Sequence, residues 1–424
     1  MEPIDFLRGA WRRVARRSKD LKFTAEVEEH PSSDAGKLVI VSHDAHLDGA
    51  PLLILHVAQA LCREFGVEVA IVLMGDGPLR EEFGKLGPLV DFTRPHWRVQ
   101  PSAETLKARA RELRRLRAAG FQHAICNTTV SGGLVPLLHQ HGFRTIVLVH
   151  ELPKLMEQLN LTKTAATIAQ FADRVIFPAT FVRDRFNEVA QIDDAKCLVR
   201  PQGLYRTNPF RGRRDFAKKQ LAQALGLPDD RPVLIGGGPA DRRKGIDIFC
   251  QVASLVLKQI PEATFVWLGD DEKDLARDCK DWLGVLGLSS QVRFTGLIRE
   301  AEVYSSYIAA ADVFMMTSRE DPFPSVVLDA MTVGVPVVGF QDAGGFADLL
   351  IKGGGLLAPY EDRAAMANAA ISLIQASGKA QAIGESGQQI IDEEFAFRDY
   401  VEDLLRLVGI RRAAVSAVIA NSET

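Results

Sequence analysis

The chain has 424 residues, of which 47% are apolar, and a formal net charge of −3. That length favours two domains over one, and the apolar content is enough to fill their cores. The near-neutral charge argues against binding driven by nucleic-acid electrostatics. Five cysteines lie scattered without a CxxC pair, so the sequence predicts neither a disulfide framework nor a zinc site and fits a reducing cytosol.

The first 22 residues carry an apolar stripe at helical spacing, surrounded by arginines. The stripe consists of Ile4, Leu7, Trp11 and Val14. This pattern predicts a basic amphipathic helix that could lie on an anionic membrane face; a solvated helix packed on its own protein or on a partner fits equally well. No apolar run reaches the roughly 18 residues that span a bilayer, and the start lacks the pattern of a secretory signal. We assign residues 1–36 to a basic helix and a polar linker.

Residues 37–203 alternate between apolar strand candidates and helical patterns. Such alternation predicts an α/β domain with a mostly parallel sheet and helices on both faces. The strands are continuously apolar, as in sheets that are covered on both sides. The predicted strands are 38–43, 67–74, 123–127, 145–150 and 174–179.

Polar loops follow two of these strands. The loop HDAHLDGAP contains Gly49, where a backbone without a side chain could approach a ligand at a helix N-terminus, which favours negative charge. A plain strand-to-helix turn explains this glycine equally well. His43 and His46 in the same loop are expected to make polar or acceptor contacts rather than to hold a metal. The second loop, after the fourth strand, begins with His150 and Glu151.

The stretch RPQGLYRTNPFRGRR is rich in Pro, Gly and Arg and predicts the connection between two domains. Its arginines are interpreted as a solvated or acceptor-facing cluster: Arg206, Arg211, Arg213 and Arg214. Alternation then resumes over 204–395, which predicts a second α/β domain, and residues 396–424 begin with another helical pattern. The predicted strands of the second domain are 233–238, 264–270, 292–296, 313–318, 335–340 and 354–359.

The loop GGGPADRRKG follows the first strand of the second domain. Its glycines remove side chains at the strand end, and Arg243 and Lys244 arrive at the start of the next helix. Fixed positive charges beside helix N–H groups suit a diphosphate. The spacing fits neither a Walker A motif nor GxGxxG, so a dinucleotide oxidoreductase is disfavoured.

An acidic pair, Glu320 and Asp321, follows the strand at 313–318, and Asp329 lies in the helix behind it. The sequence from there, DPFPSVVLDAMTVGVPVV, resembles the nucleotide-sugar signature of retaining GT-B glycosyltransferases of family four. That signature is Glu, seven residues, Glu, then Ala-Met-x-x-Gly-x-Pro-Val-Val. Here both acidic positions are aspartates, each shorter by one methylene. The resemblance covers roughly residues 38 to 405.

The resemblance implies a GT-B fold, in which two Rossmann-like domains face each other across a central cleft and a final helix crosses back to the first domain. It implies catalytic roles for three residues: His150, Lys244 and Asp321. The implied donor-binding residues are Gly49, Gly238, Arg243, Lys244, Glu320, Asp321, Phe323, Pro324, Ser325, Val326 and Asp329. Those expected to meet the acceptor are His43, His46 and Glu151. The family has an arginine where this chain has Gly238, which is a further departure.

The implied activity is transfer of a sugar, with retention, from a UDP- or GDP-linked donor to a glycan or lipid-linked hydroxyl. We expect no cofactor and no metal, because Lys244, Arg243 and the helix dipole would stabilise the leaving diphosphate. A cytoplasmic location, at the inner face of the membrane, and a part in bacterial surface polysaccharide synthesis follow from family habits. Two alternatives remain open: a catalytically silent GT-B domain that binds nucleotide sugar or scaffolds a glycan-assembly complex, and a GT-B epimerase.

Overall fold

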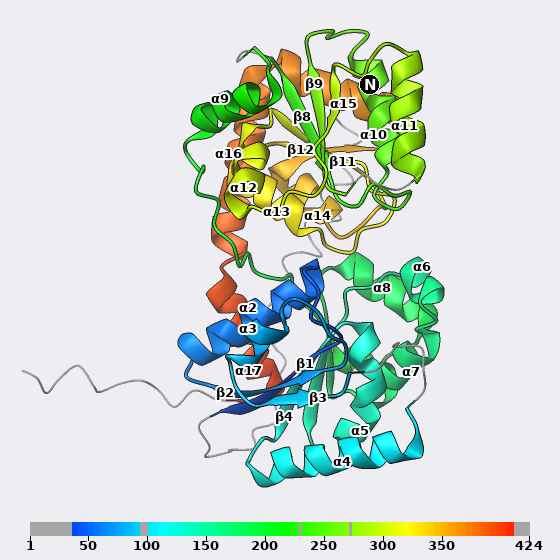
Figure 1. Cartoon of the computed structure of the whole chain (residues 1–424), viewed down its shortest axis with the longest axis vertical. Coiled ribbons are helices and arrows are strands. Elements are labelled where there is room, and N and C mark those ends of the chain that lie inside the picture. Colours follow the sequence, from blue (N-terminus) through cyan, green and yellow to red (C-terminus); the bar gives the residue numbers. More distant parts are fainter. Residues whose placement is uncertain (1–35, 94–100, 229–230, 271–273, 411–424) are drawn as a thin grey trace, which may run out of the picture. The chain divides into compact units, whose positions relative to one another are not determined.

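A computed structural model describes residues 36–93, 101–228, 231–270 and 274–410 (Figure 1). The predicted basic helix at 1–22 and the last residues after 410 lie outside this part of the chain. Two parallel β-sheets dominate the structure, as the alternating pattern predicted. Within the described residues, none of the helices combines the length and the apolarity needed to cross a bilayer.

The first sheet has seven strands in the order β3-β2-β1-β4-β5-β6-β7, all parallel. Its strands are β1 (Lys37–Ser42), β2 (Glu68–Leu73), β3 (Leu89–Asp91), β4 (His123–Asn127), β5 (Arg144–Leu148), β6 (Arg174–Phe177) and β7 (Cys197–Val199). The two short outer strands of this sheet, β3 and β7, were not predicted. The central strands are buried on both faces, which explains their unbroken apolar sequences.

Helices connect the strands of this sheet. They are α2 (Gly49–Arg63), α3 (Arg80–Gly84), α4 (Ala103–Ala118), η1 (Thr129–Leu134), α5 (Val135–Gln140), α6 (Pro153–Gln158), α7 (Thr162–Phe171), α8 (Thr180–Val189) and η2 (Asp194–Lys196). The strand order changes direction between β1 and β4. At such a switch point the connecting helices leave on opposite faces, so the carboxyl ends of these two strands are where an open α/β sheet binds ligands.

The second sheet has six parallel strands in the order β10-β9-β8-β11-β12-β13. They are β8 (Val233–Gly237), β9 (Thr264–Leu268), β10 (Val292–Phe294), β11 (Val313–Met316), β12 (Val337–Phe340) and β13 (Gly355–Ala358). The order reverses between β8 and β11, and the sequence places the glycine-rich loop after one and the acidic pair after the other. Both predicted donor loops therefore lie at the switch point of this sheet.

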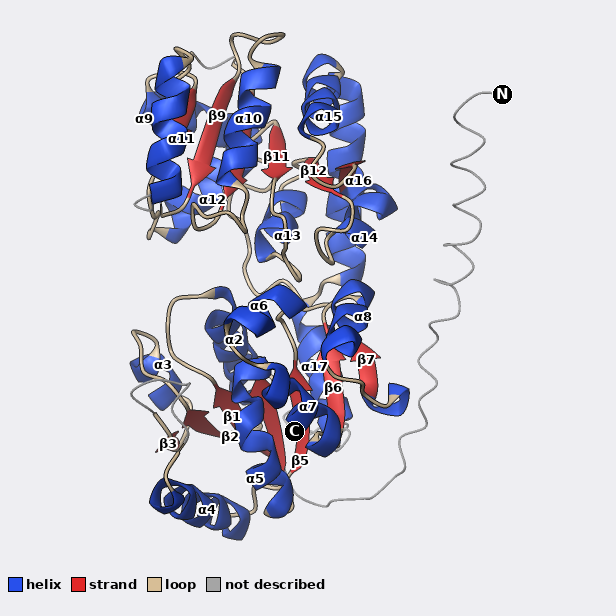
Figure 2. Cartoon of the chain, turned by 90° about the vertical axis from the view of Figure 1, so that its right-hand side faces the viewer, coloured by secondary structure: helices blue, strands red, loops and turns tan. Residues whose placement is uncertain are grey.

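The helices of this half are α9 (Arg214–Leu225), α10 (Ile246–Val256), α11 (Asp274–Val285), α12 (Ala301–Ala310), α13 (Ser325–Thr332), α14 (Ala347–Leu349), η3 (Leu350–Gly354), α15 (Arg363–Gln375) and α16 (Ser377–Glu394). The helices α10, α11 and α15 gather on one side of the sheet, and α9, α12 and α13 gather on the other (Figure 1). Both faces of the strands are thus covered by helices, and Figure 2 shows this layering from a second direction.

The last helix, α17 (Phe397–Val408), returns to the first sheet. Its buried residues Tyr400, Val401 and Leu404 belong to the same apolar cluster as Ile40 of β1 and Leu53 of α2. The connection between the sheets meets this segment on the way, since Leu204 pairs with Ala396. The chain therefore passes between the two sheets at two adjacent segments.

Candidate active site

The glycine-rich loop after β8 holds Lys244 against Gly238. Gly238 has φ of +127°, and a Cβ at this position would lie 3.1 Å from three side-chain carbons of Lys244. A side chain at position 238 would therefore crowd Lys244 and adopt an unfavourable positive φ, which is a physical reason for the glycine where the family has an arginine. Lys244 N–H donates to Asp241 Oδ1 at 2.9 Å. Gly245, with φ of +73°, then starts α10.

The lysine of this loop is ion-paired with the first aspartate of the signature. Lys244 Nζ donates to Asp321 Oδ2, and both side chains are largely buried. Asp321 is fixed by its backbone as well, because its N–H donates to Ala343 O at 2.8 Å. Two residues for which the resemblance implies catalytic and donor-binding roles are thus brought into direct contact.

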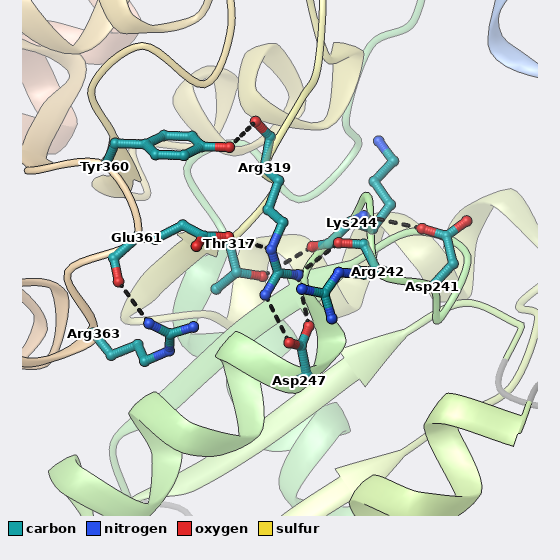
Figure 3. Close-up of polar contacts among 9 residues, drawn as sticks. All are labelled: Asp241, Arg242, Lys244, Asp247, Thr317, Arg319, Tyr360, Glu361 and Arg363. Carbon is teal, nitrogen blue, oxygen red and sulfur yellow. Dashed lines mark hydrogen bonds and ion pairs between the residues drawn. The ribbon is translucent and has the colours of Figure 1, made fainter. Parts of the chain in front are cut away.

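A buried arginine next to the acidic pair in the sequence binds the glycine-rich loop, α10 and the segment after β13, as Figure 3 shows. Arg319 donates from Nη1 and Nη2 to the two carboxylate oxygens of Asp247 at 2.8 and 2.7 Å, and from Nη1 to Arg242 O at 2.7 Å. Its Nε donates to Glu361, and its backbone N–H donates to Arg243 O at 2.8 Å. Tyr360 OH donates to Arg319 O at 3.2 Å. The Arg319 side chain therefore joins three segments near Lys244: the glycine-rich loop, α10 and the loop that carries Glu361.

The other charged residues of these loops also have partners. Arg243 Nη1 donates to Glu320 O at 3.1 Å, so this guanidinium reaches from the glycine-rich loop to the backbone of the acidic pair. Burial raises the pKa of Glu320, although the positive charges of Lys154 and Arg243 oppose that shift. Glu320 is the half-buried member of the acidic pair, and Asp321 is the buried one. Arg243 and Glu320 thus lie close to each other, next to Lys244 and Asp321 in the sequence.

The signature's second aspartate lies in α13 and is 7% exposed. Arg206 Nη2 donates to Asp329 Oδ2 at 2.6 Å, and Tyr304 OH donates to the same oxygen at 3.2 Å. Burial raises the pKa of Asp329, while the Arg206 charge opposes the shift. The resemblance implied a donor-binding carboxylate here, but the sequence did not predict its two partners.

The segment between the two aspartates begins α13. Pro324 precedes the helix, and Ser325 and Val326 occupy its first turn, where backbone N–H groups are free of helix partners. The Phe323 ring is buried and stacks on Phe395, with centroids 6.1 Å apart. Any donor contact at Phe323 would therefore come from its backbone.

The linker arginines were interpreted as a solvated or acceptor-facing cluster, but two of them are bonded to other parts of the protein. Arg206 pairs with Asp329, and Arg214 donates to Ala311 O at 2.6 Å and to Ala309 O at 3.2 Å. Burial lowers the pKa of Arg214. Arg211 does lie at the surface, paired with Asp392. Sequence spacing shows nothing of these bonds, because each joins residues about a hundred positions apart or more.

The histidines after β1 gather around an aspartate that the sequence analysis missed. Asp44 Oδ2 lies 3.3 Å from His43 Nε2 and 3.4 Å from His46 Nδ1. Among the described residues no group of three His, Cys, Asp or Glu side chains is arranged to hold an ion. Gly49 begins α2, and a Cβ there would meet nothing within 4 Å, so packing does not require a glycine at this position.

His150 and Glu151, which follow β5, are fixed by hydrogen bonds to the end of the neighbouring strand β4. Glu151 Oε2 accepts hydrogen bonds from Thr129 N at 2.9 Å, Thr129 Oγ1 at 2.7 Å and His150 N at 3.2 Å. These bonds join the ends of β4 and β5. Nε2 of His150 and Nδ1 of His43 are buried and have no hydrogen-bond partner among the described residues. Burial lowers the pKa of His150, and nearby Glu151 opposes the shift. Two buried imidazole nitrogens are therefore left unpaired near the ends of β1 and β5.

Residues 231–376 match the family described as glycosyl transferases group 1. A lipopolysaccharide core biosynthesis glycosyltransferase, LpsE of Rhizobium meliloti, is 25% identical over 188 residues, which are 44% of this chain and 52% of that protein. D-inositol 3-phosphate glycosyltransferase of Corynebacterium urealyticum is 31% identical over 178 residues, which are 41% of this chain and 42% of that protein. The chain spans about half the length of such relatives.

Solved structures resemble more of the chain. Anabaena Alr3699/HepE in complex with UDP has a TM-score of 0.73 at 22% identity, covering 88% of this chain and 98% of that one. Sucrose-phosphate synthase from Thermosynechococcus elongatus has a TM-score of 0.70, with the same identity and coverage. These likenesses confirm the predicted GT-B architecture of two parallel sheets with flanking helices.

Proposed function

Because residues 231–376 match the glycosyl transferases group 1 family and the chain has a GT-B fold, we propose that the protein is a glycosyltransferase. It moves a sugar from a nucleoside-diphosphate sugar to a hydroxyl of a glycan or lipid-linked acceptor. The observation that carries this proposal is the contact between Lys244 and Asp321 where β8 and β11 end. We assign Lys244 to the diphosphate and Asp321 to the donor sugar. The similarity to a structure that holds UDP supports a nucleotide at this sheet.

Lys244 and Arg243 stabilise the charge that develops on the leaving diphosphate. Lys244 has three donor hydrogens, so it can bind a phosphate oxygen and still donate to Asp321. Both cations are held in place before the reaction, so they stabilise the charged phosphate oxygens without having to reorganise. Such preorganised electrostatic stabilisation is often the largest contribution to enzyme catalysis. These residues take the place of a divalent metal, so the reaction needs neither metal nor other cofactor.

The proposed transfer retains the configuration at the sugar carbon. The bond from that carbon to the diphosphate oxygen breaks, and the bond to the acceptor oxygen forms on the same face. The acceptor proton goes to the departing phosphate oxygen, so no covalent intermediate with the protein forms. His150, whose low pKa keeps it neutral near pH 7, accepts or donates a hydrogen bond to a sugar hydroxyl.

A basic stripe on α4 supports a location at the inner face of the bacterial membrane. Lys107, Arg111, Arg114 and Arg115 are exposed at helical spacing on this helix, and Leu106 beside them is 43% exposed. Such a stripe attracts anionic lipid by roughly 1 kcal/mol per basic residue close to the surface. The similarity to a lipopolysaccharide core glycosyltransferase supports an acceptor of surface-glycan type.

The activity test is acceptor-dependent release of nucleoside diphosphate. The purified chain is incubated with UDP- and GDP-linked sugars, with and without lipid-linked oligosaccharide or polysaccharide acceptors. Release that requires acceptor supports the transferase. Binding of nucleotide without release under any acceptor supports the silent domain, and conversion of the sugar nucleotide alone supports the epimerase. Excess EDTA should leave the rate unchanged, and NMR of the product should show the donor's anomeric configuration.

The membrane proposal is tested separately, by sedimentation with vesicles. The charge-reversal variant Lys107→Glu/Arg111→Glu/Arg114→Glu should lose binding to phosphatidylglycerol vesicles. A matched variant on α8, Arg183→Glu/Arg185→Glu, removes arginines paired with neighbouring acids and should bind like wild type. Equal binding by all three proteins would contradict a role for α4.

A further inference from the structure

Arg206, in the linker, lies beside Asp329, the second aspartate of the signature, and has several contacts there. Its guanidinium contacts two tyrosine rings, with its carbon 5.4 Å from the Tyr205 centroid and 5.6 Å from the Tyr304 centroid. Its Nη2 is 2.6 Å from Asp329 Oδ2 and 3.4 Å from Ser325 Oγ. Two ring contacts and an ion pair together favour this position of the guanidinium.

The two donors that reach Asp329 use the same oxygen. Arg206 Nη2 and Tyr304 OH both donate to Oδ2, whereas Oδ1 receives no hydrogen bond from the residues that the structure describes. A carboxylate accepts through both oxygens. Asp329 therefore has one oxygen fixed by the protein and one that remains available to a ligand donor.

The charge of Arg206 favours the ionised form of this carboxylate, which is the better acceptor. Burial raises the pKa of Asp329, and the largest effect opposing it is the positive charge of Arg206. Tyr304, the other polar group against it, has a pKa raised well above its ordinary value by burial, so it stays a neutral donor. Without Arg206, a buried carboxylate gains protons more readily, and its protonated form is a poorer acceptor.

We propose that Arg206 is a positioning residue of the donor site, which fixes Asp329 through Oδ2 and leaves Oδ1 to accept a ribose hydroxyl of the nucleotide. The inference rests on the proposed function, since it assumes that a nucleoside diphosphate binds at β8 and β11. It makes the linker between the sheets part of the donor site. Tyr205, the next residue, stacks on His56 of α2 with centroids 4.6 Å apart, so the same linker also holds the first sheet's helix.

The inference explains how an aspartate serves where the family has a glutamate. An aspartate has one rotatable bond fewer and is easier to immobilise. With Arg206 and Tyr304 on one oxygen, the shortened side chain is preorganised rather than mobile. The shorter side chain then requires the ribose to lie closer to α13, but it does not make the carboxylate more mobile.

The test is a thermodynamic cycle that combines a substitution at Arg206 with removal of the ribose hydroxyls from the nucleotide. Binding of UDP and of 2′,3′-dideoxy-UDP is measured by calorimetry on wild type and Arg206→Met, with GDP and its dideoxy analogue in parallel. In wild type, loss of the ribose hydroxyls should weaken binding of the preferred nucleotide about 10-fold or more. In Arg206→Met the ordinary nucleotide should bind about 10-fold more weakly, and loss of the hydroxyls should cost little more, because the two changes remove one interaction.

Three variants separate this role from a general loss of structure. Arg206→Lys keeps the charge and should restore most of the affinity and of the sensitivity to ribose hydroxyls. In Arg206→Met, but not in Arg206→Lys, affinity should fall steeply as the pH is lowered from 8 to 5.5. Arg211→Gln removes a linker arginine paired at the surface with Asp392 and should leave both readouts unchanged.

The outcomes distinguish this inference from the function on which it rests. If wild type binds UDP or GDP and Arg206→Met shows the same affinity, hydroxyl sensitivity and pH profile, the role of Arg206 is overturned and the donor site stands. If wild type binds none of the nucleotides, both proposals fall. Thermal unfolding of each variant confirms that it is folded at the measuring temperature.

Discussion

Lys244 and Asp321, which are 77 residues apart in the sequence, form a buried ion pair that joins the loops after β8 and β11. The pair places a cation for the diphosphate directly beside a carboxylate for the sugar. It also ties ligand affinity to protein stability, because removal of either partner leaves the other charge buried and uncompensated. That coupling decides how variants at this site should be designed.

Lys244→Ala should weaken binding of UDP or GDP about 10- to 100-fold, since a hydrogen bond to a charged group contributes about 1.5–3 kcal/mol. It should also lower the thermal midpoint, because Asp321 loses its partner. The double variant Lys244→Ala/Asp321→Ala removes the orphaned carboxylate and should recover part of the midpoint but none of the affinity. Calorimetry and thermal unfolding check the two effects.

The control for that prediction is Lys352→Ala, which removes a lysine paired at the surface with Glu394. It should change neither affinity nor midpoint by much, as surface pairs contribute about 1 kcal/mol or less. Undiminished nucleotide binding by Lys244→Ala would show that the glycine-rich loop is not the diphosphate site.

Gly245→Ala should destabilise the protein by more than about 2 kcal/mol. Gly245 has φ of +73°, which costs an L-residue about 1–2 kcal/mol, and a Cβ there would lie 2.1 Å from Thr317 O. The matched substitution Gly378→Ala, in the first turn of α16, meets nothing within 4 Å and should be neutral or stabilising by up to about 1 kcal/mol. Urea unfolding of both variants gives the comparison; similar values for the two would contradict the close approach of the loop to β11.

Arg319→Gln should cost about 3–5 kcal/mol of stability, because it breaks a buried pair with Asp247 and leaves that carboxylate without its partner. Arg211→Gln is the matched control, since it breaks an arginine–aspartate pair of similar geometry at the surface and should cost about 1 kcal/mol or less. Nucleotide affinity should fall in Arg319→Gln as well, as Arg319 holds the loop that carries Lys244. A small and equal loss of stability in both variants would show that the Arg319 contacts do not stabilise the loop.

Much of the fold could be predicted from local pattern. Continuous apolar runs identified the central strands, such as 38–43 and 233–238, because a strand covered on both faces must be apolar throughout. Loop composition then placed Lys244 and Asp321 at the ends of strands, and the switch point explains why such ends meet. The GT-B architecture itself was predicted from the family resemblance, and the similar solved structures confirm it.

The partners of the site residues could not be predicted in the same way. Asp329 meets Arg206 across 123 residues, and Arg319 meets Asp247 across 72. Such pairs depend on how the strands are ordered in the sheet, which periodicity does not encode. Asp44 is different: it stands between His43 and His46 in the sequence, so its proximity to both was visible and was overlooked.

The stability of the protein should fall as the pH drops below about 6.5, and His150 should account for part of that loss. Burial lowers the pKa of His150, and it also lowers the pKa of His56 and His123. Below the unfolded-state value near 6.5, the unfolded chain binds protons that the folded chain does not, so stability decreases as the pH falls toward the folded values. Urea midpoints at pH 7.5 and 5.5 should therefore differ less in His150→Asn than in wild type. The exposed His139→Asn should keep the wild-type difference, and a His150→Asn protein that loses as much stability as wild type would contradict a neutral, buried imidazole at the end of β5.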